Sequence, residues 1–494
     1  MQKQDLTKVQ MSLTLKTTTG ILWNMAELVS RRGVQVLVTL LLAYFLSPED
    51  FGLVAMLTVF LALGTTLMDS GLKQALIRLK TPNQKDFATA FYANIFLGLV
   101  AYVLLFVSAP LIAQFYQEPR LIDLIRVVSL AILFSSFQTV QVATLSRELN
   151  FKAQLKANLP ASILSGILAI VLAYLDFGVW ALISQMLASV LLISIFLWMQ
   201  RLWRPTLEFS KQSLVEMYHF GYKLFLSSVI DTVFNSLYII VIAKVFSIAT
   251  AGLYFFADRI KEMVVMQLVM AIQNVTYPAL STKQDDLVQL KASYKKLVKV
   301  MTFLLFPVFL FFAALSPLIF EMFLPDKWNE ANLYLQLMII ASLLIPLHSI
   351  NLNILKVLGR SDLFLLLEIA KKTLLALILF ISIDYGIIGV LIGQIVQSVL
   401  GYFINTYFTK RLIDYTIYDQ FKDFLPGLVL SGLIAGIIYF LQLELDCIPV
   451  VELISFSVLA FSLYFLGAYL LRLHAFELIK DLLEKKFKKK VDIS

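Results

Sequence analysis

The sequence predicts an all-α polytopic membrane protein with about fourteen transmembrane helices. These helices form two pseudo-symmetric six-helix lobes followed by two additional helices. Of the 494 residues, 60% are hydrophobic and only 15% are charged, and the mean hydropathy is +0.83. Apolar runs of about twenty residues or more recur along the whole chain, and each is long enough to cross a hydrocarbon core of about 30 Å as a helix. Lysine and arginine gather in alternate connections between these runs.

The expected spans are helices because lipid offers no hydrogen bonds to an open backbone. Proline and acidic residues between the apolar runs mark several of the boundaries. The spans of the first lobe are expected near 17–46, 51–71, 87–116, 121–146, 157–175 and 178–200. Those that follow are expected near 213–246, 250–278, 297–324, 331–357, 363–383, 386–409, 424–442 and 449–471.

The basic residues orient these spans. One set of connections carries several lysines and arginines in each member, whereas the other set holds essentially Arg120 and Lys327. Cytoplasmic connections of membrane proteins carry the excess of Lys and Arg. The alternation therefore predicts that both termini lie in the cytoplasm. The same placement assigns the net charge of +8 to membrane topology rather than to nucleic-acid binding.

A weak internal repeat predicts the two lobes. Residues 43–53 and 243–253 match at a shift of 200, with Gly52 opposite Gly252, and a second match follows near a shift of 208. Parallel repeats of this kind occur in transporters that rock about a central site. The expected domains are an N-terminal lobe (1–200), a cytoplasmic linker (201–212), a C-terminal lobe (213–411), two additional helices (412–473) and a basic cytoplasmic tail (474–494).

Ionisable side chains within spans are the candidate site, because a charge in the bilayer is costly and usually functional. In the first span, Glu27 and Arg31 are four residues apart and share a helix face. Arginine suits phosphate or diphosphate because its guanidinium binds two oxygens at once. The candidate substrate-binding residues are Arg31, Arg32, Arg259 and Lys261, and the supporting or ion-coupling residues are Glu27, Asp231 and Asp258. Interhelical salt bridges and lysines that reach the membrane surface are the alternative explanation.

Other kinds of site find little support in the sequence. With one cysteine, Cys447, and three scattered histidines, neither a disulfide framework nor a metal site is expected. The chain has no GxxxxGK[ST] loop and therefore no nucleotide-hydrolysing motor of its own. We expect no cofactor, no metal and no catalytic residue.

Three stretches resemble bacterial polysaccharide exporters, the O-antigen and exopolysaccharide flippases of the multidrug/oligosaccharidyl-lipid/polysaccharide exporter superfamily. They are Leu41–Leu53, Met68–Ile77 and Leu145–Phe151, and the likeness is close to colanic-acid and teichuronic-acid exporters. A fourth stretch, Tyr254 to Pro278 with the closing residues Tyr277–Ser281, resembles the eighth helix of lipid II flippases. In that family the arginine at the position of Arg259 faces the central cavity and is implicated in substrate binding.

The resemblance implies a secondary transporter, not an enzyme, in the bacterial cytoplasmic (inner) membrane. Its substrate would be an undecaprenyl-diphosphate-linked glycan, which alternating access would move to the outer leaflet for surface polysaccharide biosynthesis. The lipid bilayer, a polysaccharide polymerase and assembly proteins are the expected partners, and nucleic acid is not. A multidrug/cation antiporter of the same superfamily is the alternative, although its cavity should be acidic and aromatic. A membrane polymerase or ligase agrees less well with the sequence. Such an enzyme normally holds its catalytic groups on a large external loop, and every expected outer loop here is short.

Overall fold

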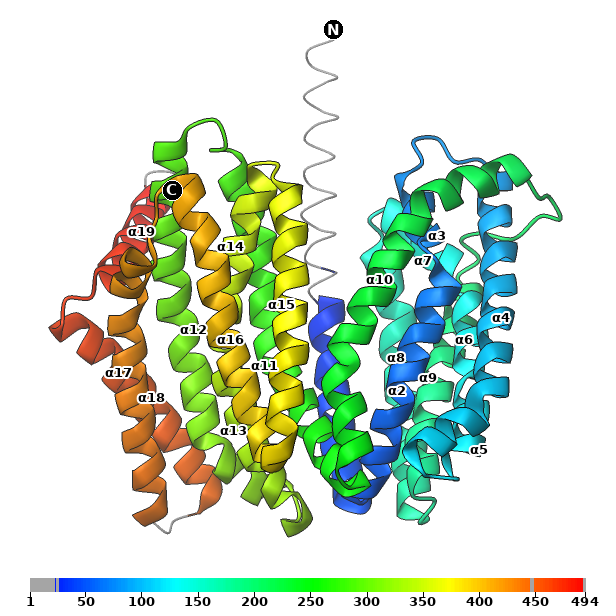
Figure 1. Ribbon diagram of the computed structural model, residues 1–494, viewed down its shortest axis with the longest axis horizontal. Helices are drawn as coiled ribbons and strands as arrows, with labels where there is room; N and C mark the ends of the chain where they lie inside the picture. The colour runs from blue at the N-terminus through cyan, green and yellow to red at the C-terminus, as the bar shows by residue number, and fades with distance from the viewer. Residues whose placement is uncertain (1–22, 24–25, 445–447, 492–494) are drawn as a thin grey trace, which may run out of the picture. The chain divides into compact units, whose positions relative to one another are not determined.

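The computed structural model describes residues 23, 26–444 and 448–491, and these residues form helices joined by short connections (Figure 1). The start of the first predicted span and Cys447 lie outside the described residues. The first helix is Ala26–Phe45. The others are α2 (Pro48–Asp69), α3 (Leu72–Arg78), α4 (Gln84–Tyr116), α5 (Leu121–Val128), α6 (Leu130–Ser136), α7 (Thr139–Arg147), α8 (Phe151–Tyr174), α9 (Val179–Met199), α10 (Lys211–Val245), α11 (Ile248–Ser281), α12 (Leu287–Phe323), η1 (Asp326–Trp328), α13 (Asn329–Ser342), α14 (Ile345–Val357), α15 (Ser361–Ser382), η2 (Ile383–Tyr385), α16 (Gly386–Ile413), α17 (Ile417–Glu444), α18 (Pro449–Leu470) and α19 (His474–Val491).

Over the residues that the structure describes, each of the fourteen predicted spans overlaps one helix or a run of two or three consecutive shorter helices. Eleven helical segments of the described chain are long and apolar enough to cross a membrane, or twelve with the bent pair 121–136 and 139–147. One of these segments, Ser361–Ile413, contains both α15 and α16, which were expected as separate spans. The remaining predicted span, 250–278, coincides with α11. The predicted fold class, an all-helical polytopic membrane protein, is confirmed.

The chain divides into two compact units, of which the first ends at Phe255 and the second begins at Phe256. In the first unit, α4 and α10 pack against α2, α8 packs against α9, and α6 packs against both α4 and α9 (Figure 1). The predicted linker 201–212 begins in the helix-free connection between α9 and α10. Because α10 packs on α2, α3 and α4, the first unit extends beyond this linker.

The two repeat glycines meet at a close crossing of α2 and α11 inside the first unit. A Cβ atom on Gly52 would lie 2.0 Å from the carbonyl oxygen of Ile248. A Cβ atom on Gly252 would lie 1.7 Å from the carbonyl oxygen of Pro48. These two contacts are equivalent at the shift of 200 that relates the sequence repeats. Both positions therefore require glycine, because any side chain would push the two backbones apart.

In the second unit, α12 is the central helix, and α13, α17, α18 and α19 all pack against it. Buried aromatic residues fill this core, and the Tyr464 hydroxyl donates a hydrogen bond to the carbonyl oxygen of Phe303 at 2.9 Å. The two additional helices predicted near 424–442 and 449–471, α17 and α18, thus pack on α12. The first turns of α19 also pack on this core through Ala475, Phe476 and Ile479.

We predict that Gly252→Ala and Gly52→Ala lower the stability of the protein in detergent by about 1–3 kcal/mol, as overpacking does in tightly packed cores. The measurement is the apparent melting temperature of the purified protein. Gly432→Ala in α17 is the matched control, because a Cβ atom there meets nothing within 4 Å. Alanine is the better helix former, so this control should melt no lower than the wild type. Equal melting of all three variants would contradict the glycine crossing.

Candidate functional site

Glu27 is the buried member of a polar cluster in the first unit, which it forms with the partly exposed Arg31 and Asn158. Arg31 Nε lies 3.0 Å from Glu27 Oε1 and donates a hydrogen bond to it. The Nδ2 group of Asn158, from α8, donates to the same oxygen at 2.8 Å. Glu27 is 6% exposed, whereas the Arg31 side chain is 35% exposed. The predicted pairing of Glu27 with Arg31 is confirmed, and Asn158 is a third member that sequence reasoning missed.

The arrangement fixes Glu27 and leaves Arg31 accessible. Asn158 and Arg31 approach one carboxylate oxygen from two different helices, so the orientation of Glu27 is well determined. The contact with Arg31 uses its Nε–H, and a guanidinium carries four further N–H donors on its two Nη groups. Arg31 is therefore held in position by Glu27 while most of its hydrogen-bonding capacity remains suited to an anion.

In the second unit, the charged run of α11 forms pairs along its own helix. Arg259 Nη1 lies 3.8 Å from Glu262 Oε2, and Lys261 forms a short contact with Asp258 Oδ1. The Arg259 side chain is 36% exposed and that of Lys261 is 20% exposed. Both basic side chains are thus paired with acidic neighbours three residues away, and Arg259 is the more accessible of the two.

The two remaining predicted residues lie in the first unit, Arg32 in the first helix and Asp231 in α10. Both belong to candidate membrane spans. The structure therefore brings Glu27 together with Arg31, and Asp258 together with Lys261. The roles assigned to these residues from the sequence stay predictions.

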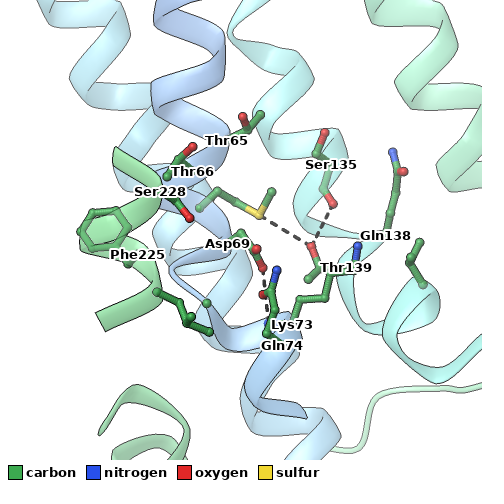
Figure 2. A pocket seen from close by; sticks show the side chains of 14 residues that line it. Thr65, Thr66, Asp69, Lys73, Gln74, Ser135, Gln138, Thr139, Phe225 and Ser228 are labelled. Carbon is green, nitrogen blue, oxygen red and sulfur yellow. Dashed lines mark hydrogen bonds between the residues drawn. The ribbon is translucent and has the colours of Figure 1, made fainter. Parts of the chain in front are cut away.

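The first unit also contains a polar cavity of about 460 Å³ that sequence reasoning missed (Figure 2). Its wall comes from the end of α2, the turn into α3, the break between α6 and α7, and the middle of α10. The cavity is lined by Thr65, Thr66, Met68, Asp69, Gly71, Lys73, Gln74, Ser135, Gln138, Thr139, Val142, Leu224, Phe225 and Ser228. Most of these side chains are polar, although the helices that carry them are apolar overall.

Local contacts hold this wall in place. Asp69 Oδ1 accepts a hydrogen bond from the backbone N–H of Lys73 at 3.3 Å, at the turn between α2 and α3. Two glycines bring α10 against this turn, since a Cβ atom on Gly71 would lie 2.6 Å from the carbonyl oxygen of Gly221. Gly71 also has a φ of +74°, in the left-handed region that favours glycine. The close approach of α10 places Phe225 and Ser228 opposite α7, as Figure 2 shows.

One signal in the sequence could have found part of this cavity. Thr65 and Asp69 are four residues apart and therefore share a helix face, which is unusual within an apolar span, and Lys73 follows at the start of α3. Gln138 was recognised only as one of many amides inside spans. Its contribution depends on the break after α6, which the sequence does not mark with glycine or proline.

We predict that Glu27→Ala destabilises the protein by about 1–3 kcal/mol, because a buried hydrogen-bond partner is lost from both Arg31 and Asn158. The measurement is a double-mutant cycle of melting temperatures with Arg31→Ala. The double variant should lose less stability than the two single variants lose in sum, since the two residues act as one unit. Additive losses would show that the pair does not interact.

Comparisons with known proteins agree with this architecture. Residues 41–333, more than half of the chain, match the family described as polysaccharide biosynthesis protein. The chain is 28% identical to the lipopolysaccharide biosynthesis protein WzxC of Escherichia coli K12, over 80% of this chain and 82% of that protein. It is 24% identical to the teichuronic acid biosynthesis protein TuaB of Bacillus subtilis, over 87% of this chain and 89% of that protein.

Two solved structures share the fold. The lipid II flippase MurJ in an inward closed conformation has a TM-score of 0.74 at 15% identity, and the likeness covers 92% of this chain and 99% of MurJ. An inward-facing multidrug resistance transporter of the MATE family has a TM-score of 0.55 at 17% identity, and the likeness covers 79% of this chain and 99% of the transporter. These likenesses show the fold, and the match over residues 41–333 shows that the chain belongs to the polysaccharide biosynthesis protein family.

Proposed function

We propose that this protein is a secondary transporter, a flippase for an undecaprenyl-diphosphate-linked oligosaccharide repeat unit. It moves the repeat unit from the cytoplasmic to the outer leaflet by alternating access, for surface polysaccharide biosynthesis. Its relatives support this substrate class, since they include proteins named for lipopolysaccharide and teichuronic acid biosynthesis. The succinoglycan biosynthesis transport protein ExoT of Rhizobium meliloti, 24% identical over 65% of each chain, supports transport.

The observation that carries the proposal is a partly exposed arginine that donates to a buried carboxylate within a membrane span. Arg31 is oriented by Glu27, which in turn is oriented by Asn158. A membrane helix rarely keeps such a group without a use for it. A diphosphate is the part of the substrate that a guanidinium recognises best, because it offers paired anionic oxygens. Arg259 in the second unit is a further arginine for this purpose. Arg32 in the first unit and Lys261 in the second are additional cationic groups.

The remaining features follow from this assignment. The protein lies in the bacterial cytoplasmic membrane with both termini in the cytoplasm, and a polymerase and assembly proteins receive its product. The membrane potential or an ion gradient drives the cycle, and the acidic residues Glu27, Asp231 and Asp258 are the candidates for binding a coupling cation.

A multidrug antiporter is the second candidate function, supported by the fold shared with the MATE transporter. Such a protein has no evident use for Arg31.

We predict that Arg31→Ala and Arg259→Ala each abolish or severely reduce surface polysaccharide when they replace the wild-type protein. The readout is a complementation assay in a strain that lacks its own flippase. Arg31→Lys should restore export only in part, because lysine cannot form the bidentate contact.

Arg204→Ala is the matched control, since Arg204 is an exposed arginine of the connection between α9 and α10. It should support full export at equal expression. Full export by the two alanine variants, at normal protein levels, would remove the arginines from the mechanism. Loss of resistance to cationic drugs, with polysaccharide unaffected, would favour the antiporter instead.

A further inference from the structure

The polar cavity of the first unit has a lining rich in hydrogen-bond acceptors. The hydroxyls of Thr65 and Thr66 both donate to the carbonyl oxygen of Ala62, at 3.0 and 2.8 Å. The Thr139 hydroxyl donates to the carbonyl oxygen of Ser135 at 3.3 Å. Met68 Sδ, 3.7 Å from Thr139 Oγ1, is a second acceptor for the Thr139 hydrogen. These hydroxyl hydrogens are thus used by acceptors of the protein itself, so each oxygen offers the cavity its lone pairs.

Two more groups reinforce this polarity. Gln138 donates through Nε2 to the carbonyl oxygen of Val190 on α9 at 2.8 Å, which fixes its amide and leaves Oε1 as the acceptor of that side chain. Asp69 contributes a carboxylate, which only accepts when it is ionised. Lys73 is the strong donor among the labelled side chains, and in Figure 2 it extends toward Thr139, on the other side of the cavity from the Asp69 carboxylate.

A lining with this many acceptors suits a ligand that donates hydrogen bonds. A diphosphate has only acceptors at neutral pH, so it can bond the donors of the lining, such as Lys73 and Gln74, but gains nothing from the Asp69 carboxylate or from the threonine and Gln138 acceptors. A sugar residue carries several hydroxyl donors, and its ring also has apolar C–H faces. Phe225, Leu224 and Met68 supply apolar surface to the same cavity. The lining therefore offers acceptors to the sugar hydroxyls and an apolar surface to the C–H faces of the ring.

We infer that this cavity is a sugar-binding subsite, which holds one or more hydroxyl-bearing sugar residues of the substrate head group. The inference rests on the proposed function and deepens it, because it separates the group that reads the sugar from the arginines that hold the diphosphate. Thr65, Thr139, Gln138 and Asp69 accept hydrogen bonds from the sugar, and Phe225 packs against its ring. Sugar specificity then resides in α2, α7 and α10.

The test compares two probes on the full-length protein in lipid nanodiscs. One is polyprenyl diphosphate, and the other is the same lipid carrying a single hexose, taken from a panel of glucose, galactose and N-acetylglucosamine. The wild type should bind at least one glycosylated probe more tightly than the bare lipid. Thr65→Val with Thr139→Val keeps the shape of the wall but removes two acceptors, and it should reduce this preference about 3- to 10-fold.

Thr58→Val is the matched control, because Thr58 lies on the same helix and bonds Ala55 in the same way but does not line the cavity. It should keep the full preference. Arg31→Ala should weaken both probes equally. The inference is overturned if the wild type binds all probes alike, or if the double valine variant weakens the bare lipid as much as the glycosylated one.

Two further outcomes would also reject the subsite. If Asp69→Asn removes a dependence of binding on sodium or pH while the sugar preference persists, the cavity is a cation site. If the wild type binds neither probe, the proposed function itself fails and the sugar subsite fails with it. If only the subsite fails, the wild type still binds the bare lipid, and Arg31→Ala still weakens that binding.

Discussion

The absence of water from the hydrocarbon core is the constraint on which this structure depends, because every backbone polar group must find a partner within the protein. The break between α6 and α7 shows how it is met. The carbonyl oxygen of Phe134 accepts a hydrogen bond from Ser194 Oγ at 2.8 Å, and that of Phe137 accepts one from Trp198 Nε1 at 3.0 Å. Two side chains of α9 thus support the break, and this support allows Ser135, Gln138 and Thr139 to line the polar cavity.

Buried charge obeys the same constraint by a different route. In the second unit, Asp423 near the start of α17 accepts a hydrogen bond from the Tyr415 hydroxyl at 2.6 Å and lies 3.1 Å from Lys299 Nζ. Its side chain is 5% exposed, so its charge depends on these partners. Glu27 in the first unit is stabilised in the same way by Arg31 and Asn158. Each buried carboxylate therefore joins two helices, which makes it structural as well as a candidate for function.

The sequence predicts whatever depends on local chemistry. Hydropathy locates the spans, and the lysines and arginines of the connections predict which ends of the spans face the cytoplasm. The spacing of Glu27 and Arg31 predicts their contact, because residues four apart share a helix face. Asn158 lies 131 residues from Glu27, and no local pattern connects the two. The cavity likewise requires α10 to lie beside α2. The contact between Gly71 and Gly221 sets this approach, and these two glycines are far apart in the sequence. What the sequence leaves open is which helix faces meet.

The chemistry of the two polar regions also bears on how a transporter releases what it binds. A site must bind well enough to load the substrate and weakly enough to let it leave, a requirement shared with channels. Neutral hydrogen bonds contribute about 0.5–1.5 kcal/mol each, whereas those to charged groups contribute about 1.5–3 kcal/mol. In the sugar-binding role that we infer, the neutral hydroxyl and amide acceptors of this cavity, beside the charged Asp69 and Lys73, distinguish one sugar from another through many small contributions and do not trap it. In the proposed mechanism the stronger attraction comes from Arg31, and its pairing with Glu27 leaves the guanidinium with an acidic partner after the anion departs.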